Sequence, residues 1–381
     1  MERDEQPLDL FMTVDFPPRG GGESTYIYLH AAHYPQPRKV LTVQTPNSEA
    51  FDAALDFEVI RVPDIRPLVP LFFLLYTLFI ISPQRIRFIH CAQLRTVGFT
   101  CLLLKLFFAL PYGIHVYGGE RSKFADRPLW RRLLQPVLKH ARAIFAISVW
   151  TKEQFLDYGI PPERLLIVNP AVDTDRFHPL PNRAQLRQKF EVESRQTLLS
   201  ISRLDPHKGA DMVLRALPEL LGQFPDLLFV IGGGGSMRET LENMVVELKL
   251  ENHVRFLGFV ADEDLIEWYN AADIFIMPSR LGTGSQRGVE GFGIVYLEAN
   301  ACKTPVIGGR SGGVPDAVEH GSSGLLVDPE DPGDIAAAIA KLLADPPYAQ
   351  RLAAQGRARV LTQFTGPILA AALHREVSRR L

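Results

Sequence analysis

The stretch from Thr197 to Leu221, T-L-L-S-I-S-R-L-D-P-H-K-G-A-D-M-V-L-R-A-L-P-E-L-L, decides the fold class. It begins with a short apolar run, Thr197–Ile201, which has the length and composition of a buried strand. It ends with a helix pattern over Asp211–Leu221. The loop between them carries Pro206 and Gly209, residues that interrupt regular structure. A strand, a loop and a helix in this order form the repeating unit of α/β proteins with parallel sheets.

The same alternation of apolar runs and helix patterns fills the chain in two series. The predicted strands are Leu8–Val14, Lys39–Val43, Phe57–Val62, Arg87–Cys91, Gly113–Tyr117, Ala143–Ile147 and Leu165–Val168, then Thr197–Ile201, Leu227–Ile231, Val254–Leu257, Ile274–Met277, Pro305–Ile307 and Gly324–Val327. A proline-rich polar stretch, Asn169–Glu193, separates the series and is typical of a linker. We therefore expect two Rossmann-like, doubly wound parallel-sheet domains, residues 1–180 and 181–366, facing a central cleft.

Length and composition agree with two globular domains and exclude some classes of protein. The chain has 381 residues, 46% of them hydrophobic, and a net charge of −2, which gives no reason to expect a nucleic-acid partner. Its three cysteines have no metal-site spacing and no disulfide framework, and the charged first residues do not form a signal peptide. We expect a cytoplasmic protein. Asp173-Thr174-Asp175 is interpreted as a turn rather than a metal site.

Two apolar runs lie beside a basic region in the first half of the chain. Leu71–Ile81 and Phe99–Leu110 are too short to cross a bilayer, so each predicts a buried or interfacial helix. Residues 83–142 contain eleven Lys and Arg but two acidic residues, a net charge of +9. Such a region favours docking to an anionic membrane surface. An ordinary solvated face remains the alternative.

The segment Glu290–Glu298, E-G-F-G-I-V-Y-L-E, combines two carboxylates with a glycine loop that enters a helix. The N–H groups and dipole at such a helix start suit a phosphate. Carboxylates accept hydrogen bonds from sugar and ribose hydroxyls. Together these features indicate a nucleotide-sugar site, although turn and capping roles alone would also explain the acidic residues.

Other loops at predicted strand ends fit the same ligand. Arg203 and Lys208 follow the strand Thr197–Ile201, where both cations could reach one diphosphate. Pro17-Pro18-Arg19-Gly20-Gly21-Gly22 follows the first strand, and its glycines allow close approach of the backbone. Gly232–Gly235 suggests a dinucleotide fingerprint, but Met237 replaces its third glycine, so a nicotinamide enzyme is a distant alternative.

In this order the motifs resemble the retaining glycosyltransferases of family 4, which have the two-domain GT-B fold. The resemblance covers nearly the whole chain. It rests on Pro18-Arg19-Gly20-Gly21, Asn169-Pro170-Ala171-Val172-Asp173, Arg203 with Lys208-Gly209, Leu257-Gly258-Phe259-Val260, Glu290 with Glu298, Ser311-Gly312-Gly313-Val314-Pro315-Asp316 and Gly324-Leu325-Leu326-Val327.

The resemblance implies a role for each matching residue. Arg203 and Lys208 are expected to bind the donor diphosphate, Glu290 the transferred sugar and Glu298 the ribose. The remaining donor contacts implied are Gly20 and Gly21 at the phosphates, Val260 near the base, and the backbone of Gly291, Phe292, Gly293 and Ile294. It also implies catalysis without a metal or other cofactor, and a last helix, residues 367–381, that returns to the first domain.

One position departs from the family pattern. A histidine near the reacting carbon is common in the family, but Tyr117 occupies its place, and His115 lies two residues earlier on the same side of the strand. A tyrosine is a poor base near neutral pH. Ser202 also replaces a usual glycine before Arg203.

The stretch from Met277 to Glu298 is most similar to members that use GDP-mannose, such as the phosphatidylinositol mannosyltransferases. We therefore expect transfer of a hexose, mannose above others, to a lipid-linked or glycan acceptor at the inner face of the cell membrane, with formation of an α-glycosidic bond. Two alternatives stay open. One is a UDP-sugar transferase with a soluble acceptor, and the other is a catalytically weak sugar-nucleotide-binding protein.

Overall fold

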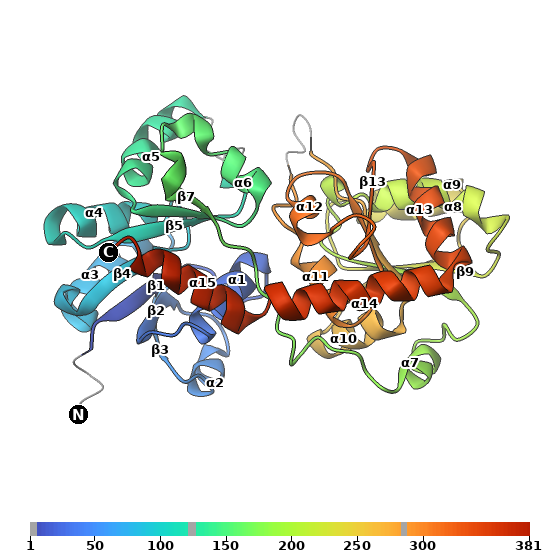
Figure 1. The fold of residues 1–381 in the computed structure, drawn as a ribbon, viewed down its shortest axis with the longest axis horizontal. Helices are drawn as coiled ribbons and strands as arrows, with labels where there is room; N and C mark the ends of the chain where they lie inside the picture. The colour runs from blue at the N-terminus through green and yellow to red at the C-terminus, as the bar shows by residue number, and fades with distance from the viewer. Residues whose placement is uncertain (1–5, 121–126, 283–287) are drawn as a thin grey trace. The chain divides into compact units, whose positions relative to one another are not determined.

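The computed structural model describes residues 6–120, 127–282 and 288–381 (Figure 1). The chain divides into two compact units. Unit 1 comprises Met1–Ala171 with Gly366–Leu381, and unit 2 comprises Val172–Thr365. Each unit has its own parallel sheet with helices on both faces, as the sequence predicts.

The sheet of unit 1 has seven strands in the order β3-β2-β1-β4-β5-β6-β7, all parallel. The strands are β1 (Leu8–Met12), β2 (Arg38–Val43), β3 (Glu58–Val62), β4 (Ile86–Cys91), β5 (Tyr112–Val116), β6 (Ala143–Ala146) and β7 (Leu165–Ile167). They coincide with the predicted apolar runs. Side chains alternate across a strand, so β1 places Leu8, Leu10 and Met12 in one core and Asp9 and Phe11 on the opposite face.

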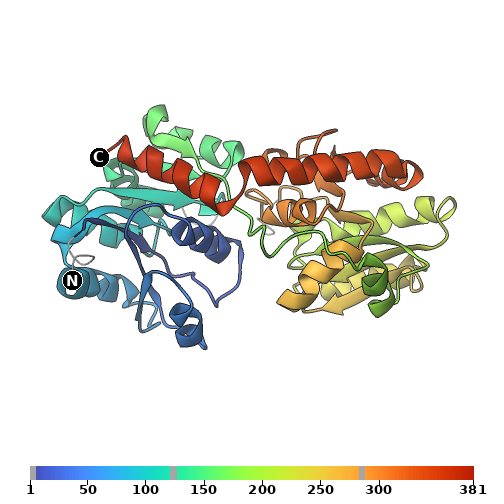
Figure 2. The same ribbon diagram turned by 60° about the horizontal axis from the view of Figure 1, so that its bottom comes forward.

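Helices of unit 1 cover the two faces of this sheet. The core with Leu10 also contains side chains from α3 (Val69–Tyr76), α4 (Gly98–Phe108) and α5 (Pro128–His140). A π-helix, η2 (Thr77–Ile81), continues α3, so the two predicted apolar helices are present. On the other face, α1 (Gly22–Ala32) packs against α15 (Gly366–Ser378), which Figures 1 and 2 both show. The short helices are α2 (Ser48–Ala53) and α6 (Val149–Glu153).

Unit 2 has six parallel strands in the order β10-β9-β8-β11-β12-β13. The strands are β8 (Gln196–Ile201), β9 (Leu227–Gly232), β10 (Val254–Gly258), β11 (Ile274–Met277), β12 (Val306–Gly309) and β13 (Leu325–Val327). The helices are α7 (Arg183–Lys189), α8 (Ala210–Leu221), α9 (Arg238–Glu247), α10 (Asp262–Ala271), α11 (Ile294–Ala301), α12 (Val314–Ala317), α13 (Pro332–Ala344) and α14 (Pro346–Gln363). The order reverses between β8 and β11, where ligands of such sheets commonly bind.

The division between the units lies earlier in the chain than the predicted boundary at 180/181. The backbone N–H of Val172 donates to the carbonyl of Phe364, 2.8 Å away, which joins the chain after Ala171 to the end of α14. The Asn270 side chain also binds Leu180 N–H and the carbonyl of His178. Residues 172–180 therefore pack on unit 2 instead of ending unit 1.

No helix within the described residues is long and apolar enough to cross a membrane.

Candidate functional site

The carboxyl ends of β8 and β11 bring a lysine and a glutamate together in unit 2. Lys208 ends the loop after β8, and Glu290 precedes α11. The Lys208 Nζ donates to Glu290 Oε2 at 2.5 Å, and both side chains are 15% exposed. Two of the predicted site residues thus form one partly buried ion pair, although they lie far apart in the sequence.

Glycines make this approach of loops possible. Gly209 has a φ of +80°, and a Cβ there would lie 2.2 Å from the carbonyl oxygen of Pro278, in the loop after β11. Gly312 has a φ of +56°, and a Cβ there would lie 2.5 Å from the carbonyl oxygen of Glu290. That carbonyl accepts the N–H of Gly313 at 2.9 Å. The backbone on both sides of the ion pair is therefore fixed by close packing.

The start of α11 lies next to this pair along the chain. Gly293 is the N-cap residue, with a φ of +94° that side chains disfavour. The first N–H groups of an α-helix have no acceptor within the helix and attract anions. The side chain of Phe292 is buried and packs near Phe364, so at this predicted position only the backbone of Phe292 can face a ligand. Gly291 is buried, and Ile294 is the first residue of the helix.

Glu298 lies one turn into α11 and is 8% exposed. Its Oε2 accepts a hydrogen bond from the Tyr269 hydroxyl at 3.0 Å. Burial raises the pKa of Glu298 to about 7, against the opposing effects of the Tyr269 hydrogen bond and the nearby Arg176 charge. Tyr269 is not recognisable from the sequence as a site residue. It is one apolar residue among several in α10, and no local motif marks it.

Arg203 and Val260 lie in loops of the same unit, but among the described residues neither forms a hydrogen bond or ion pair with Lys208 or Glu290. The Arg203 side chain is 78% exposed and pairs with Asp205 at 3.0 Å. Val260 is half-buried, and a Cβ on Gly232 would lie 2.7 Å from it. Gly233 has a φ of +111°, and a Cβ there would lie 1.9 Å from the carbonyl oxygen of Ser202. Close loop packing thus explains glycines of the 232–235 run without a dinucleotide.

The predicted glycine loop of unit 1 lies between β1 and α1. A Cβ at Gly20 or Gly21 would have no atom within 4 Å, so both backbones border open space. Arg61 of β3 stabilises the loop, because its Nη2 donates to the carbonyl of Pro17 at 2.6 Å. Its guanidinium also forms a bidentate pair with Asp52. Arg61 is not recognisable from the sequence as a site residue, because its role depends on a contact between β3 and the distant loop after β1.

Tyr117 follows β5 in unit 1. Its ring lies edge-on to Tyr26, with centroids 5.5 Å apart, and its buried hydroxyl has no hydrogen-bond partner among the described residues. The Glu120 carboxylate accepts the N–H groups of Tyr117 and Gly118 at 2.7 and 2.8 Å. Burial, with the negative charge of Glu23, raises the pKa of Tyr117 well above its usual value. Tyr117 is therefore neutral near pH 7 and cannot serve there as a base.

His115 is fully buried within a chain of hydrogen bonds. The chain runs from Tyr26 through His115 and His90 to Tyr34 and Asp9, with distances of 2.8, 3.2, 3.3 and 2.7 Å. An ionised Asp9 only accepts, so each group donates toward it, and both histidines must be neutral Nε2–H tautomers. Burial lowers the pKa of both histidines. His115 therefore cannot replace the missing histidine at a solvent-facing site.

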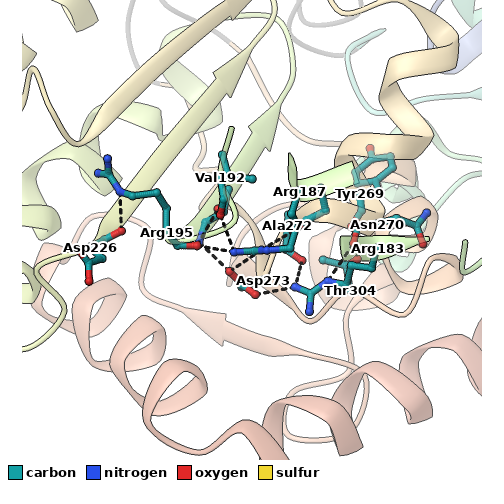
Figure 3. Close-up of polar contacts among 12 residues, drawn as sticks. Arg183, Arg187, Val192, Arg195, Asp226, Tyr269, Asn270, Ala272, Asp273 and Thr304 are labelled. Atoms are coloured by element: carbon teal, nitrogen blue, oxygen red, sulfur yellow. Dashed lines mark hydrogen bonds and ion pairs between the residues drawn. The ribbon is translucent and has the colours of Figure 1, made fainter. Parts of the chain in front are cut away.

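A second polar cluster lies at the opposite, amino-terminal ends of β8 and β11 (Figure 3). Arg183 and Arg187 donate to the Asp273 carboxylate at 2.6 and 3.1 Å, and Thr197 N–H donates to it at 2.8 Å. A cavity of about 370 Å³ borders Arg183 and Asp273. Because these charges pair with each other, the cluster is explained by the attachment of α7 to the sheet.

Acidic and metal-ligating side chains do not gather into a metal site in the described part of the chain. Asp173 accepts the N–H groups of Asp175 and Arg176 at 3.1 and 3.0 Å. It therefore forms a turn, as expected from the sequence.

Comparison with protein families finds two matches that together span most of the chain. Residues 20–176 match the model described as Glycosyltransferase Family 4, and residues 182–359 match Glycosyl transferases group 1.

Curated relatives match nearly from end to end. A protein of Mycolicibacterium smegmatis named GDP-mannose-dependent alpha-(1-6)-phosphatidylinositol monomannoside mannosyltransferase is 35% identical over 91% of this chain and 92% of its own. A Corynebacterium glutamicum protein named GDP-mannose-dependent monoacylated alpha-(1-6)-phosphatidylinositol monomannoside mannosyltransferase is 32% identical over 94% and 95%.

Solved structures share the fold at lower identity. The Anabaena protein HepE in complex with UDP and glucose has a TM-score of 0.81 at 20% identity, with 98% of this chain and 100% of that chain covered. Sucrose-phosphate synthase from Thermosynechococcus elongatus has a TM-score of 0.77 at 24% identity, with 98% and 99% covered.

Proposed function

The chain belongs to glycosyltransferase family 4, and on that premise we propose that it transfers mannose from GDP-mannose to a phosphatidylinositol-based lipid, forming an α-glycosidic bond. Its two Rossmann-like units are those of the GT-B fold. The assignment of the donor and the acceptor rests on the near full-length similarity to relatives named for GDP-mannose and phosphatidylinositol mannosides.

Site residues of unit 2 have the chemistry that a nucleotide-sugar donor requires. In the proposed complex, Lys208 turns from Glu290 to the donor diphosphate, and the start of α11 contributes N–H donors. Arg203 adds a second cation, since its exposed side chain needs only to leave Asp205. Glu290, released from Lys208, accepts hydrogen bonds from the mannose hydroxyls. The base would lie near Val260.

The proposed reaction proceeds without a protein nucleophile. The acceptor oxygen forms a bond to the anomeric carbon on the face from which the diphosphate leaves, and a phosphate oxygen takes the acceptor proton. Lys208 and Arg203 then stabilise the negative charge that develops on the diphosphate. Gly20 and Gly21 are proposed to approach the phosphates through their open backbone. The neutral Tyr117 fits this scheme, because the scheme assigns the proton to the phosphate.

A donor screen tests the proposed function directly. The purified protein is incubated with GDP-mannose, UDP-glucose or UDP-N-acetylglucosamine in the presence of monomannosylated phosphatidylinositol. We expect mannose to appear in the lipid fraction from GDP-mannose alone. Transfer from a UDP-sugar would replace the proposal with the UDP-dependent alternative, and donor binding without transfer or hydrolysis would favour a catalytically weak binding protein.

We also propose that the reaction needs no metal or other cofactor, as the family resemblance implies. Excess EDTA should leave the rate of transfer unchanged within about twofold, because protein cations and helix N–H groups then supply the charge stabilisation. Loss of activity that added Mg²⁺ or Mn²⁺ restores would contradict this.

A lipid acceptor requires access to a membrane, and unit 1 exposes an apolar face for which we propose an anionic membrane surface as the partner. The face consists of exposed side chains on α3, η2, α4 and α5, namely Leu71, Leu75, Phe79, Ile80, Leu103, Leu106, Phe107, Phe108, Leu129 and Leu133. The helix α4 contacts both α3 and α5. Arg127, Arg131, Arg132 and Lys139 lie exposed at α5. Arg121 and Lys123 of the predicted basic region fall outside the described residues. The proposed location is the inner face of the cell membrane.

Vesicle flotation tests this surface. Phe79 and Phe107 are 77% and 75% exposed. Insertion of each side chain into the membrane should contribute roughly 1.5–3 kcal/mol to the binding free energy. Replacing both with Ser should therefore weaken binding to anionic vesicles by tenfold or more. Val246→Ser is the matched control, since Val246 is 63% exposed but lies in unit 2. Equal recovery of wild type and double variant would contradict the assignment.

A further inference from the structure

The protein holds the Glu298 carboxylate at one of its two oxygens. Its Oε2 accepts the Tyr269 hydroxyl at 3.0 Å. The structure records no hydrogen bond to Oε1 from any described residue, and Oε1 is not among the buried atoms that lack a partner. One oxygen is therefore fixed, while the other remains available to a ligand.

Tyr269 is held rigidly enough to impose this geometry. Its ring is fully buried and lies edge-on to Phe177 and Phe275, with centroid distances of 6.0 and 5.5 Å. Its backbone carbonyl accepts the Thr304 hydroxyl at 2.5 Å, in the cluster of Figure 3. Aromatic packing and this backbone contact leave the tyrosine side chain little freedom to move.

We propose that Tyr269 is a positioning residue for the nucleotide, which fixes Glu298 Oε2 so that Oε1 receives the ribose hydroxyls. The inference rests on the proposed function only in taking the ligand to be a nucleoside diphosphate sugar. The ribose is common to GDP and UDP donors, so the role of Tyr269 does not depend on which base or sugar is bound. Phe177, in the segment after Ala171, supports the same carboxylate indirectly through its contact with the Tyr269 ring.

Ionisation of Glu298 follows from this arrangement. Ribose hydroxyls bind the charged carboxylate better than the neutral acid, while burial holds the pKa of Glu298 near 7. Nucleotide affinity should therefore fall as pH decreases through about 7. The other groups that act on Glu298 are Arg176 of the linker and Asp262 at the start of α10, which lower and raise its pKa respectively. Cys302 follows on α11, and burial raises the pKa of its thiol to about 12, so it stays protonated.

The first test compares nucleotides with and without ribose hydroxyls by titration calorimetry on the full chain. Wild type should bind GDP at least tenfold more tightly than 2′,3′-dideoxy-GDP, the effect of losing hydrogen bonds to a charged group. Tyr269→Phe should reduce that ratio by about threefold or more, since Glu298 is no longer oriented. The KM for the donor should rise while kcat stays within about twofold, because a ribose contact is made equally in the ground state and the transition state.

The second test follows the pH dependence of nucleotide binding. In wild type, the GDP dissociation constant should increase as the pH falls below the pKa of Glu298, and the increase should approach about tenfold for each pH unit. Tyr269→Phe should move this midpoint to higher pH, because a hydrogen bond that lowers the pKa has been removed. The dideoxy nucleotide carries the same phosphates but no 2′- and 3′-hydroxyls, so the pH dependence of its binding measures the titration of the phosphates separately from that of Glu298. Tyr112→Phe is the matched control, since the buried Tyr112 hydroxyl binds the Val137 carbonyl in unit 1.

The outcomes separate this inference from the proposed function. Ribose discrimination that depends on Tyr269, without mannose transfer, would leave the inference standing and remove the proposed function. A Tyr269→Phe variant with the wild-type ratio and midpoint would overturn the inference whatever the donor is. Failure of wild type to bind any nucleotide would overturn both.

Discussion

The two units hold their polar side chains in opposite ways. In unit 1, Tyr26, His115, His90, Tyr34 and Asp9 form a buried chain in which each contact is made within the protein. In unit 2, Glu298 is held at one oxygen, and Lys208 has Glu290 as its partner at the edge of the sheet. A satisfied buried network specifies one structure, whereas partly satisfied groups at strand ends remain able to exchange partners with a ligand. Changes in this buried chain of unit 1 should therefore affect stability, and changes at the strand-end site of unit 2 should affect activity.

The largest expected effect is on stability. Asp9 is fully buried, and Arg87 forms a bidentate pair with it. Asp9→Ala should lower the free energy of unfolding by roughly 3–5 kcal/mol, because it leaves a charge and the Tyr34 hydroxyl unpaired. Urea unfolding followed by fluorescence in a Trp268→Phe background measures it, since the other two tryptophans, Trp130 and Trp150, lie in unit 1.

The control for this change is Asp56→Ala, which breaks the Arg38–Asp56 pair of unit 1. Asp56 is 76% exposed, so the loss should stay below about 1 kcal/mol. If Asp9→Ala lowered kcat/KM of the folded protein tenfold with little loss of stability, the contrast between the units would be wrong.

The next effect is on turnover. Lys208→Ala should reduce kcat by roughly 10²-fold or more, as expected when a charge that stabilises the transition state is lost. The folded protein should remain, because the pair with Glu290 is only partly buried. Lys189→Ala breaks the exposed Lys189–Glu267 pair of the same unit and should leave turnover unchanged. Lys208→Ala activity within a few-fold of wild type would remove the assignment of the diphosphate site.

Acid should destabilise unit 1. Burial lowers the pKa of His30 to about 4, below its unfolded value near 6.5, so the unfolded state binds more protons between these values. The stabilising contribution of neutral His30 is therefore fully present above about pH 6.5 and decreases as the pH falls below that value. His30 alone should account for about 1.4 kcal/mol between pH 7.5 and 5.5, and His90 and His115 act in the same direction. The pKa of Asp9 is about 2, so Asp9 does not titrate in this range. Unfolding free energies that do not change with pH in the Trp268→Phe background would contradict the prediction.

The smallest effect should come from Arg203. Its side chain is 78% exposed, so Arg203→Ala removes a contact that solvent already screens. We expect a loss of roughly tenfold or less in kcat/KM for the donor, with no change in the unfolding free energy. A loss equal to that of Lys208→Ala would show that both cations act as one unit on the diphosphate.

The sequence predicted the strands well, because a strand is indicated by the apolar pattern of its own few residues. The run Thr197–Ile201 followed by a helix identifies β8 and α8 without knowledge of their neighbours. The parallel order of such units also places their loops at one sheet edge. The proximity of Lys208 and Glu290 therefore agrees with their assignment to one site, although the roles themselves remain predictions.

Contacts between side chains that lie far apart in the chain could not be predicted from the sequence. Tyr269 and Glu298 meet through two helices whose packing no motif encodes, and Arg61 reaches Pro17 across neighbouring strands. The sequence places His115 two residues before Tyr117, on the same side of the strand, but does not show whether it could take the role of the missing histidine. Burial against His90 and Tyr26 excludes that role, and burial depends on which helices cover the face.

The return of Gly366–Leu381 to unit 1 has a consequence for how the protein is made. A ribosome completes all of Val172–Thr365 before it releases the segment that covers α1. During synthesis, unit 2 can acquire its full core while unit 1 still exposes the surface that α15 later occupies. A released chain truncated after Thr365 should therefore be protease-resistant in the second unit and protease-sensitive in the first.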